Sequence, residues 1–172
     1  KKVGRLAQEL FELARLEYGV VKPQKEPFSL SELVQDVFQK FELATETRGQ
    51  KLLADITPGI PLVNAVLGMI ERVLTNLLDN AIRFTPHGGV IEIKLWQQEN
   101  QVMVQLKDSG PGIAAELKDS LFVRPSILST NKHRAGGLGL MIVHRILQLH
   151  GGNIRLIEQP KHGACFQFSV PV

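Results

Sequence analysis

The sequence predicts an α/β (α+β) two-layer sandwich, in which a mixed β-sheet carries helices on one face and an amphipathic helix precedes the domain. Two observations support this fold class. Stretches with the apolar period of a helix are interspersed with shorter stretches in which apolar and polar residues alternate, as in strands. After the first amphipathic helix, their order is helix, strand, helix, two strands, helix and two strands.

The first part of the chain is expected to hold two helices and a linker. Apolar residues spaced by three and four over residues 3–18 are typical of a helix that pairs with another helix, or that packs on its own domain. Two prolines make residues 20–27 a linker. A capping-box pattern at Ser29 and Glu32 begins the second helix, over residues 30–47. The apolar residues of the first helix are Val3, Leu6, Leu10 and Leu13.

The remaining elements are expected to form the sheet and the helices that cover it. A third helix, over residues 65–84, has one broad apolar face and a polar stripe on the opposite side. A long irregular stretch follows at residues 108–137, and loops of this length are usually functional in a compact domain. Strands are expected over residues 51–56, 90–96, 102–107, 153–158 and 164–170, and a fourth helix over residues 138–150.

Composition excludes several classes of protein. With 44% hydrophobic and 22% charged residues among 172, the chain is neither disordered nor collagenous, and its single cysteine fits a reducing compartment. Twenty basic against 17 acidic residues is too small an excess to indicate nucleic-acid binding. No stretch reaches the roughly 20 apolar residues that cross a bilayer. Because the chain begins without methionine, we interpret it as a fragment of a longer protein, and a membrane anchor upstream stays open.

The polar stripe of the third helix contains two asparagines. Asn76 and Asn80 are one turn apart, so both amides project from the same side of the helix. Asparagine is a poor helix former, so two of them call for an explanation. One interpretation is that the carbonyl oxygen of Asn80 faces a hydrated Mg²⁺ while Arg83 reaches a phosphate. The alternative is the exposed polar face of an amphipathic helix.

A carboxylate and two glycines follow the strand at residues 102–107. Asp108 begins the sequence Asp-Ser-Gly-Pro-Gly, which bends the chain sharply at the end of that strand. A carboxylate in this place can accept a hydrogen bond from an exocyclic amine. The alternative is an ordinary turn, which such residues also form.

A second glycine-rich segment leads into the fourth helix. Residues 136–140 read Gly-Gly-Leu-Gly-Leu, and their amides, together with the positive end of the helix, can hold phosphate oxygens. The segment is not a P-loop, because no Gly-Lys-Ser/Thr follows. Lys132 and Arg134 precede the glycines and either add positive charge at the phosphates or are solvated.

The three motifs, in this order and spacing, resemble the ATP-binding catalytic domain of a sensor histidine kinase. Its superfamily also holds gyrase and heat-shock chaperone ATPases. Residues 76–85 match the asparagine box, residues 108–112 the Asp-x-Gly-x-Gly box, and residues 137–140 the second glycine box. Phe122 matches the phenylalanine box.

The resemblance implies an organisation for the whole chain. Residues 1–19 are similar to the end of the second helix of the dimerisation and phosphotransfer domain, residues 20–27 are the linker, and residues 28–172 are the catalytic domain. Implied cofactors are ATP and Mg²⁺, and the implied location is cytoplasmic, in a full-length protein that is anchored in the membrane. The implied partners are the dimerisation and phosphotransfer domain, which is missing here, a response regulator, and a second copy in a full-length homodimer.

The resemblance also implies a role for each matching residue. Asn80 would coordinate Mg²⁺, Asn76 and Arg83 would contact the phosphates during transfer, and Asp108 would recognise the adenine amine. Phe122 would anchor the ATP lid. The other residues expected to bind nucleotide are Phe84 and Ile113 at the adenine, Gly110 and Gly112 beside it, and Lys132, Arg134, Gly137, Leu138, Gly139 and Leu140 near the phosphates.

The chain departs from the family pattern at three points. Pro125 stands where a second aromatic residue usually follows Phe122, which puts the lid anchor in doubt. Ala164-Cys165-Phe166 stands where threonines often precede the phenylalanine. The chain has no His-Glu-x-x-Thr-Pro motif, so we expect the phosphoacceptor histidine to lie upstream.

Two alternative functions stay open at this point. A water-using ATPase of the same superfamily would carry a glutamate as general base at the position of Asn76, and an amide cannot accept a proton at neutral pH. A degenerate signalling module would bind nucleotide without kinase activity.

Overall fold

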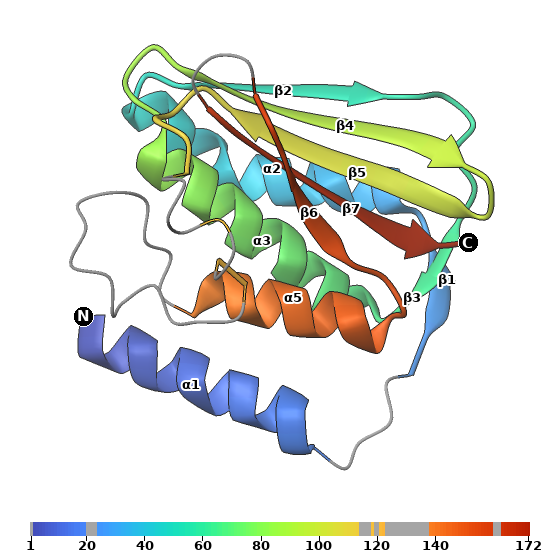
Figure 1. The fold of residues 1–172 in the computed structure, drawn as a ribbon. Coiled ribbons are helices and arrows are strands. Elements are labelled where there is room, and N and C mark those ends of the chain that lie inside the picture. The colour runs from blue at the N-terminus through green and yellow to red at the C-terminus, as the bar shows by residue number, and fades with distance from the viewer. Residues whose placement is uncertain (1, 20–23, 114–117, 119–120, 123–137, 160–162) are drawn as a thin grey trace.

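The computed structural model describes residues 2–19, 24–113, 118, 121–122, 138–159 and 163–172, and Figure 1 shows their arrangement. A sheet forms one layer, helices cover one of its faces, and the N-terminal helix lies outside that helical layer. The predicted fold class is confirmed. The helices are α1 (Lys2–Tyr18), α2 (Leu30–Thr47), α3 (Leu67–Phe84) and α5 (Gly139–Leu149).

The main sheet has five strands in the order β2-β4-β5-β7-β6. The pair β2 and β4 is parallel, and the other neighbours are antiparallel, so the sheet is mixed as predicted. Its strands are β2 (Lys51–Ile56), β4 (Val90–Gln98), β5 (Gln101–Asp108), β6 (Ile154–Ile157) and β7 (Ala164–Pro171).

A second, two-stranded sheet was not predicted. It pairs β1 (Glu26–Phe28) with β3 (Val63–Ala65) in antiparallel register. Strand β1 lies partly within the predicted linker and contains Pro27. Strands of three residues are too short to show an alternating pattern, so their pairing partner has to be known before they can be recognised.

The covering helices begin and end close to the predicted residues. Helix α2 has the predicted bounds, and the Ser29 hydroxyl accepts a hydrogen bond of 3.2 Å from the backbone N–H of Glu32. Helix α3 begins two residues later than predicted, because β3 ends at Ala65 and Val66 is the N-cap. Its side chains Ile70, Val73 and Leu77 are buried, and burial of each such side chain contributes roughly 1.5–3 kcal/mol.

Helix α1 packs on its own domain. Leu13 is buried and Leu16 lies against the core, whereas Leu10, which belongs to the same predicted apolar seam, is 59% exposed. The helix lies alongside α5 (Figure 1), and two ion pairs, Arg5–Asp79 and Glu12–Arg72, connect it to α3. None of the helices in the described part of the chain is long and apolar enough to cross a membrane.

His150 connects the end of α5 to the start of α3. Its Nδ1 lies 2.8 Å from the Ile146 carbonyl oxygen, and its Nε2 accepts a 3.1 Å hydrogen bond from the backbone N–H of Val66. This arrangement needs the neutral ring, because a protonated Nε2 cannot accept. Burial lowers the pKa of His150 below its usual 6.5, with repulsion from Lys25 as a smaller cause.

We therefore expect the fold to lose stability in mild acid. The unfolded chain binds a proton at this ring more readily than the folded chain, so the contribution is present above about pH 6.5 and falls as pH drops through that value. Urea unfolding between pH 5 and 8 measures this dependence. His150→Gln should unfold at lower urea with a flatter pH dependence, and equal pH dependence in both proteins would contradict the assignment.

Candidate functional site

The side chain of Asn80 in α3 is buried in a way that the packing of the described residues does not explain. Its side chain is 5% exposed, and neither Oδ1 nor Nδ2 has a hydrogen-bond partner among the described residues. An unsatisfied buried polar group costs about 1–3 kcal/mol. The interpretation as an exposed polar face therefore fails for Asn80, and its amide is suited to a bound group.

The surroundings of Asn80 fit Mg²⁺ carried in with phosphates. Mg²⁺ prefers oxygen ligands and keeps several waters, so one or two protein oxygens are enough. The described residues contain no cluster of three or more His, Cys, Asp or Glu side chains that would form a protein cage for a metal. The amide oxygen of Asn80, buried and without a partner among the described residues, would suit such an ion.

Asn76 joins α3 to the beginning of α5. Its Nδ2 donates a 3.1 Å hydrogen bond to the carbonyl oxygen of Gly139, the first residue of α5. The N-cap of α5, Leu138, makes no side-chain capping bond, which leaves the first N–H groups of this helix to other acceptors. A helix start of this kind suits an anion.

Two leucines of the second glycine segment are buried. Leu138 is 3% exposed, and Leu140, which is 4% exposed, lines the same small cavity as Asn76 and Asn80. Lys132, Arg134 and Gly137 lie outside the described residues.

Arg83 is held by a carboxylate that sequence analysis missed. Its Nη2 lies 3.0 Å from Asp79 Oδ2, and Arg5 Nη2 of α1 lies 2.7 Å from the same oxygen. The guanidinium carbon of Arg83 is 6.0 Å from the centre of the Phe84 ring. Asp79 therefore orients Arg83, at the end of α3 that also carries Asn80.

Asp108 lies buried at the end of β5 and is 3% exposed. Its Oδ1 accepts hydrogen bonds from the backbone N–H groups of Gly110, at 2.9 Å, and Ala164, at 3.4 Å. The turn at Gly110 is thus of the ordinary Asp type, and it also holds the carboxylate in one orientation.

Two glycines allow the chain to close around Asp108. Gly112 has a φ of +84°, and a Cβ there would lie 3.0 Å from the carbonyl oxygen of Gly163. Gly163 has a φ of +111°, and its Cβ would collide with the carbonyl oxygen of Asp108. Gly163 was not predicted as a site residue, because its close neighbour Asp108 is 55 residues away in the chain.

The side chain of Ile113 lies at a cavity beside this turn. The cavity measures about 130 Å³ and is lined by Pro111, Gly112, Ile113 and Ala164, among others. Phe122 packs nearby, with its ring centre 6.0 Å from His144 and 6.0 Å from Phe166. Phe122 is therefore anchored to α5 and β7, whereas Pro125 lies outside the described residues.

Glu9 of α1 also belongs to this region and was not predicted. Arg5, Glu9, Asn76, Asn80 and Gly139 line a cavity of about 10 Å³ together with Asp79, Arg83 and Leu140. Burial raises the pKa of Glu9, and the charges of Arg5, Arg72 and Arg83 partly offset this. The sequence contains no hint of this contact, because it depends on how α1 docks.

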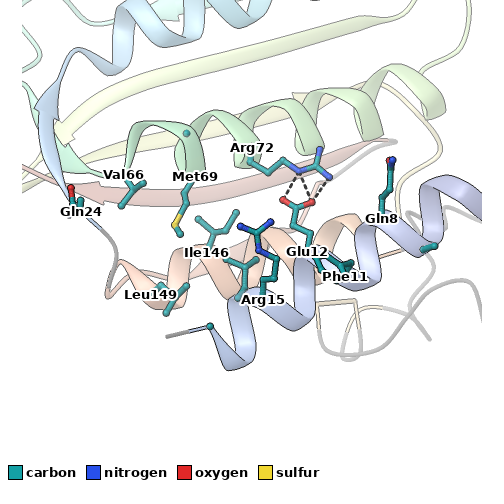
Figure 2. Close-up of a pocket in the computed structure, with 14 residues that line it drawn as sticks. Gln8, Phe11, Glu12, Arg15, Gln24, Val66, Met69, Arg72, Ile146 and Leu149 are labelled. Atoms are coloured by element: carbon teal, nitrogen blue, oxygen red, sulfur yellow. Dashed lines mark hydrogen bonds and ion pairs between the residues drawn. The ribbon is translucent and has the colours of Figure 1, made fainter. Parts of the chain in front are cut away.

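A larger cavity lies between α1, α3 and α5 (Figure 2). It measures about 990 Å³, and apolar side chains such as Phe11, Met69 and Ile146 line it. It contains none of the residues predicted for the site. The predicted residues that the structure describes lie instead mainly at two places, around Asn80 and around Asp108.

Residues 66–172 match the family described as histidine kinase-, DNA gyrase B- and HSP90-like ATPases. The adaptive-response sensory kinase SasA of Synechococcus sp. (strain CC9311) is 32% identical over 100% of this chain and 45% of its own length. This chain therefore spans less than half of that relative.

Two solved structures share the fold. Histidine kinase ThkA in complex with the response regulator protein TrrA has a TM-score of 0.80 and 29% identity, over 99% of this chain and 48% of that one. Full-length ShkA in complex with AMPPNP has a TM-score of 0.85 and 24% identity, over 97% of this chain and 35% of that one.

Proposed function

The chain belongs to the family of histidine kinase-, DNA gyrase B- and HSP90-like ATPases, and on this premise we propose that it is the catalytic ATP-binding part of a sensor histidine kinase. It binds Mg²⁺-ATP and transfers the γ-phosphoryl group to a histidine outside this chain. The observation that carries the proposal is the buried amide of Asn80, which has no hydrogen-bond partner in the part of the chain that the structure describes. It lies in one cluster with Asn76, Arg83 and the start of α5.

Each residue of the site has a part in this reaction. Asp108 accepts a hydrogen bond from the exocyclic amine of adenine, and Asn80 holds the metal. Bound Mg²⁺ supplies charge neutralisation at the phosphate oxygens. Arg83 and the N–H groups at the start of α5 hold the phosphates for attack by an imidazole nitrogen, which forms a P–N bond as ADP leaves. Phosphoryl transfer needs mainly such positioning and neutralisation.

The proposed partners follow from the relatives. The structure of ThkA with a response regulator supports a response regulator as the next acceptor, through its aspartate. The AMPPNP complex of ShkA, which shares the fold, supports an adenine nucleotide. A homodimer of the full-length protein, formed through the dimerisation and phosphotransfer domain, and a cytoplasmic place for this domain are parts of the same proposal.

A water-using ATPase agrees less well with the site. Asn76 occupies the position of the general base in that branch, and its Nδ2 donates to the Gly139 carbonyl oxygen. The amide oxygen that remains cannot take a proton from water at neutral pH.

Labelled ATP tests the proposal. With Mg²⁺ and ATP labelled at the γ-phosphate, this chain by itself should acquire no acid-labile label. A longer form of the protein that includes the upstream histidine should become labelled, and the label should disappear in Asn80→Ala. Acid-labile label on residues 1–172 alone would contradict the proposal. Equal labelling of the longer protein with and without Asn80→Ala would also contradict it.

A further inference from the structure

Strand β2 forms one edge of the main sheet. It pairs with β4, and no other described strand lies beside it. Figure 1 shows β2 along the upper border of the sheet. Four of its six residues are exposed and the other two are partly buried. The side of β2 that faces away from β4 is therefore accessible to another strand.

The backbone groups on this open side have no partner among the described residues. At the two ends of the ladder with β4, the N–H of Lys51 donates to the Gly89 carbonyl oxygen and the N–H of Thr57 donates to that of Leu95, each at 3.0 Å. Because successive residues of a strand point their backbone groups to opposite sides, the residues between these ends alternate between β4 and the open side. A row of free N–H and carbonyl groups is a template for another strand. The groups on the open side belong to Leu52, Ala54 and Ile56.

The side chains of β2 that face away from the helices carry two opposite charges around one leucine. Side chains alternate between the two faces of a sheet, and Leu52 and Ile56 pack against the core on the helical side. Lys51, Leu53 and Asp55 therefore lie on the other face, where all three are exposed and Leu53 is 46% exposed. Neither Lys51 nor Asp55 makes an ion pair with another described residue. Both charges are thus available to a partner.

This pattern is complementary to itself when a second copy runs antiparallel. With Leu53 opposite Leu53 of the second copy, Lys51 of each copy lies opposite Asp55 of the other. In the same register Leu52 lies opposite Ala54, and both have their backbone groups on the open side, so they exchange N–H to carbonyl hydrogen bonds. A slide of two residues would place Leu53 opposite a charge, and a slide of four would place like charges opposite each other, which destabilises a strand pair. The side chains therefore favour this one register.

The helical layer leaves the edge open as well. Ala54 lies on the helix-facing side of β2, next to Ile93 of β4. Ile93 is 2% exposed, whereas Ala54 is exposed although it is on the same face. The helices therefore do not cover β2 at the middle of the strand, where the second copy would pair.

We propose that β2 is a self-association surface, at which two copies of this chain pair edge to edge and antiparallel, and so join their sheets across a two-fold axis at Leu53. The contact is closed, because both copies use the same strand. Six residues from each copy form a small interface, and small interfaces are typical of weak, transient association. None of the residues proposed to bind nucleotide belongs to β2, so the inference goes beyond the proposed function and does not depend on it.

Sedimentation equilibrium at chain concentrations up to about 1 mM, which detects weak association, tests this inference. The wild type should show a monomer–dimer equilibrium. Asp55→Lys and Lys51→Asp each place like charges opposite each other at both ends of the contact, so each should weaken self-association roughly tenfold or more. Arg155→Asp reverses an exposed charge on β6, the strand at the opposite edge of the sheet, and should associate like the wild type. Urea unfolding confirms that each variant is folded.

Mixing the two weakened variants gives a result that is specific to this register. Asp55→Lys presents two lysines and Lys51→Asp presents two aspartates, so opposite charges meet again at both ends of the contact. The mixture should form heterodimers with at least the affinity of the wild type, although neither variant pairs well with itself.

Hydrogen exchange provides a readout that needs no substitution. The amides of Leu52 and Ala54 should exchange more slowly in the wild type as its concentration is raised. A wild type that stays monomeric up to about 1 mM would overturn the inference. Self-association that the charge reversals in β2 do not weaken, or a mixture that associates no better than its two components, would also overturn it.

Discussion

Asn80→Ala is expected to lower the affinity for the Mg²⁺-bound ATP analogue by roughly 100-fold, at the upper end of losses from metal-site substitutions. The reason is that Asn80, in the proposed function, supplies the amide oxygen for the metal. Calorimetry with and without Mg²⁺ measures the effect, and the loss should be confined to the titration with Mg²⁺. Asn64→Ala, which removes an exposed asparagine from β3, should bind like the wild type.

The same substitution separates a functional asparagine from a structural one. Because both polar atoms of the Asn80 side chain are buried without partners among the described residues, alanine should leave the free energy of unfolding unchanged or raise it by up to about 1–3 kcal/mol. If Asn80 were a structural residue, its replacement would lower the free energy of unfolding. Normal Mg²⁺-dependent affinity in Asn80→Ala, together with a less stable fold, would contradict the assignment.

Asp108→Asn is expected to remove most of the preference for adenine over guanine. Asp108 Oδ1 is engaged by the N–H groups of Gly110 and Ala164, so the amide oxygen of asparagine would stay there and its NH₂ group would meet the amine of adenine. Two donors then face each other. The loss of about 1–3 kcal/mol corresponds to a change in selectivity of roughly 5- to 150-fold.

Titration with ATP and GTP analogues measures this selectivity. Asp55→Asn is the matched control, because it makes the same chemical change at an exposed position of β2. If Asp108→Asn keeps the adenine preference of the wild type, Asp108 does not recognise the base.

The long elements could be predicted because their patterns are local. Helix α2 and strand β2 have the predicted bounds, since a capping box and an alternating stretch identify them without reference to the rest of the chain. Strands β1 and β3 could not be predicted. Three residues are too few to show an alternating pattern, and the two strands are stabilised by pairing with each other.

The site was predictable only in part for a similar reason. The spacing of Asn76 and Asn80 indicates that both lie on one side of α3. Only the packed structure shows that the Asn80 side chain is buried and has no hydrogen-bond partner among the described residues. Glu9 reaches the site from α1 and Gly163 from the turn before β7, and each contact depends on tertiary structure. The apolar residues of α1 were compatible with packing on another helix or on the domain itself. Burial of Leu13 in the core shows that α1 packs on its own domain.

The central claim is that this chain binds an adenine nucleotide through Mg²⁺ at Asn80 and Asp108. Its most direct test is a calorimetric titration of the wild-type chain with a non-hydrolysable ATP analogue, with and without Mg²⁺, and with the corresponding GTP analogue. The account predicts one binding site that prefers adenine and depends on Mg²⁺. Absence of binding, or equal binding of the ATP and GTP analogues, would contradict it.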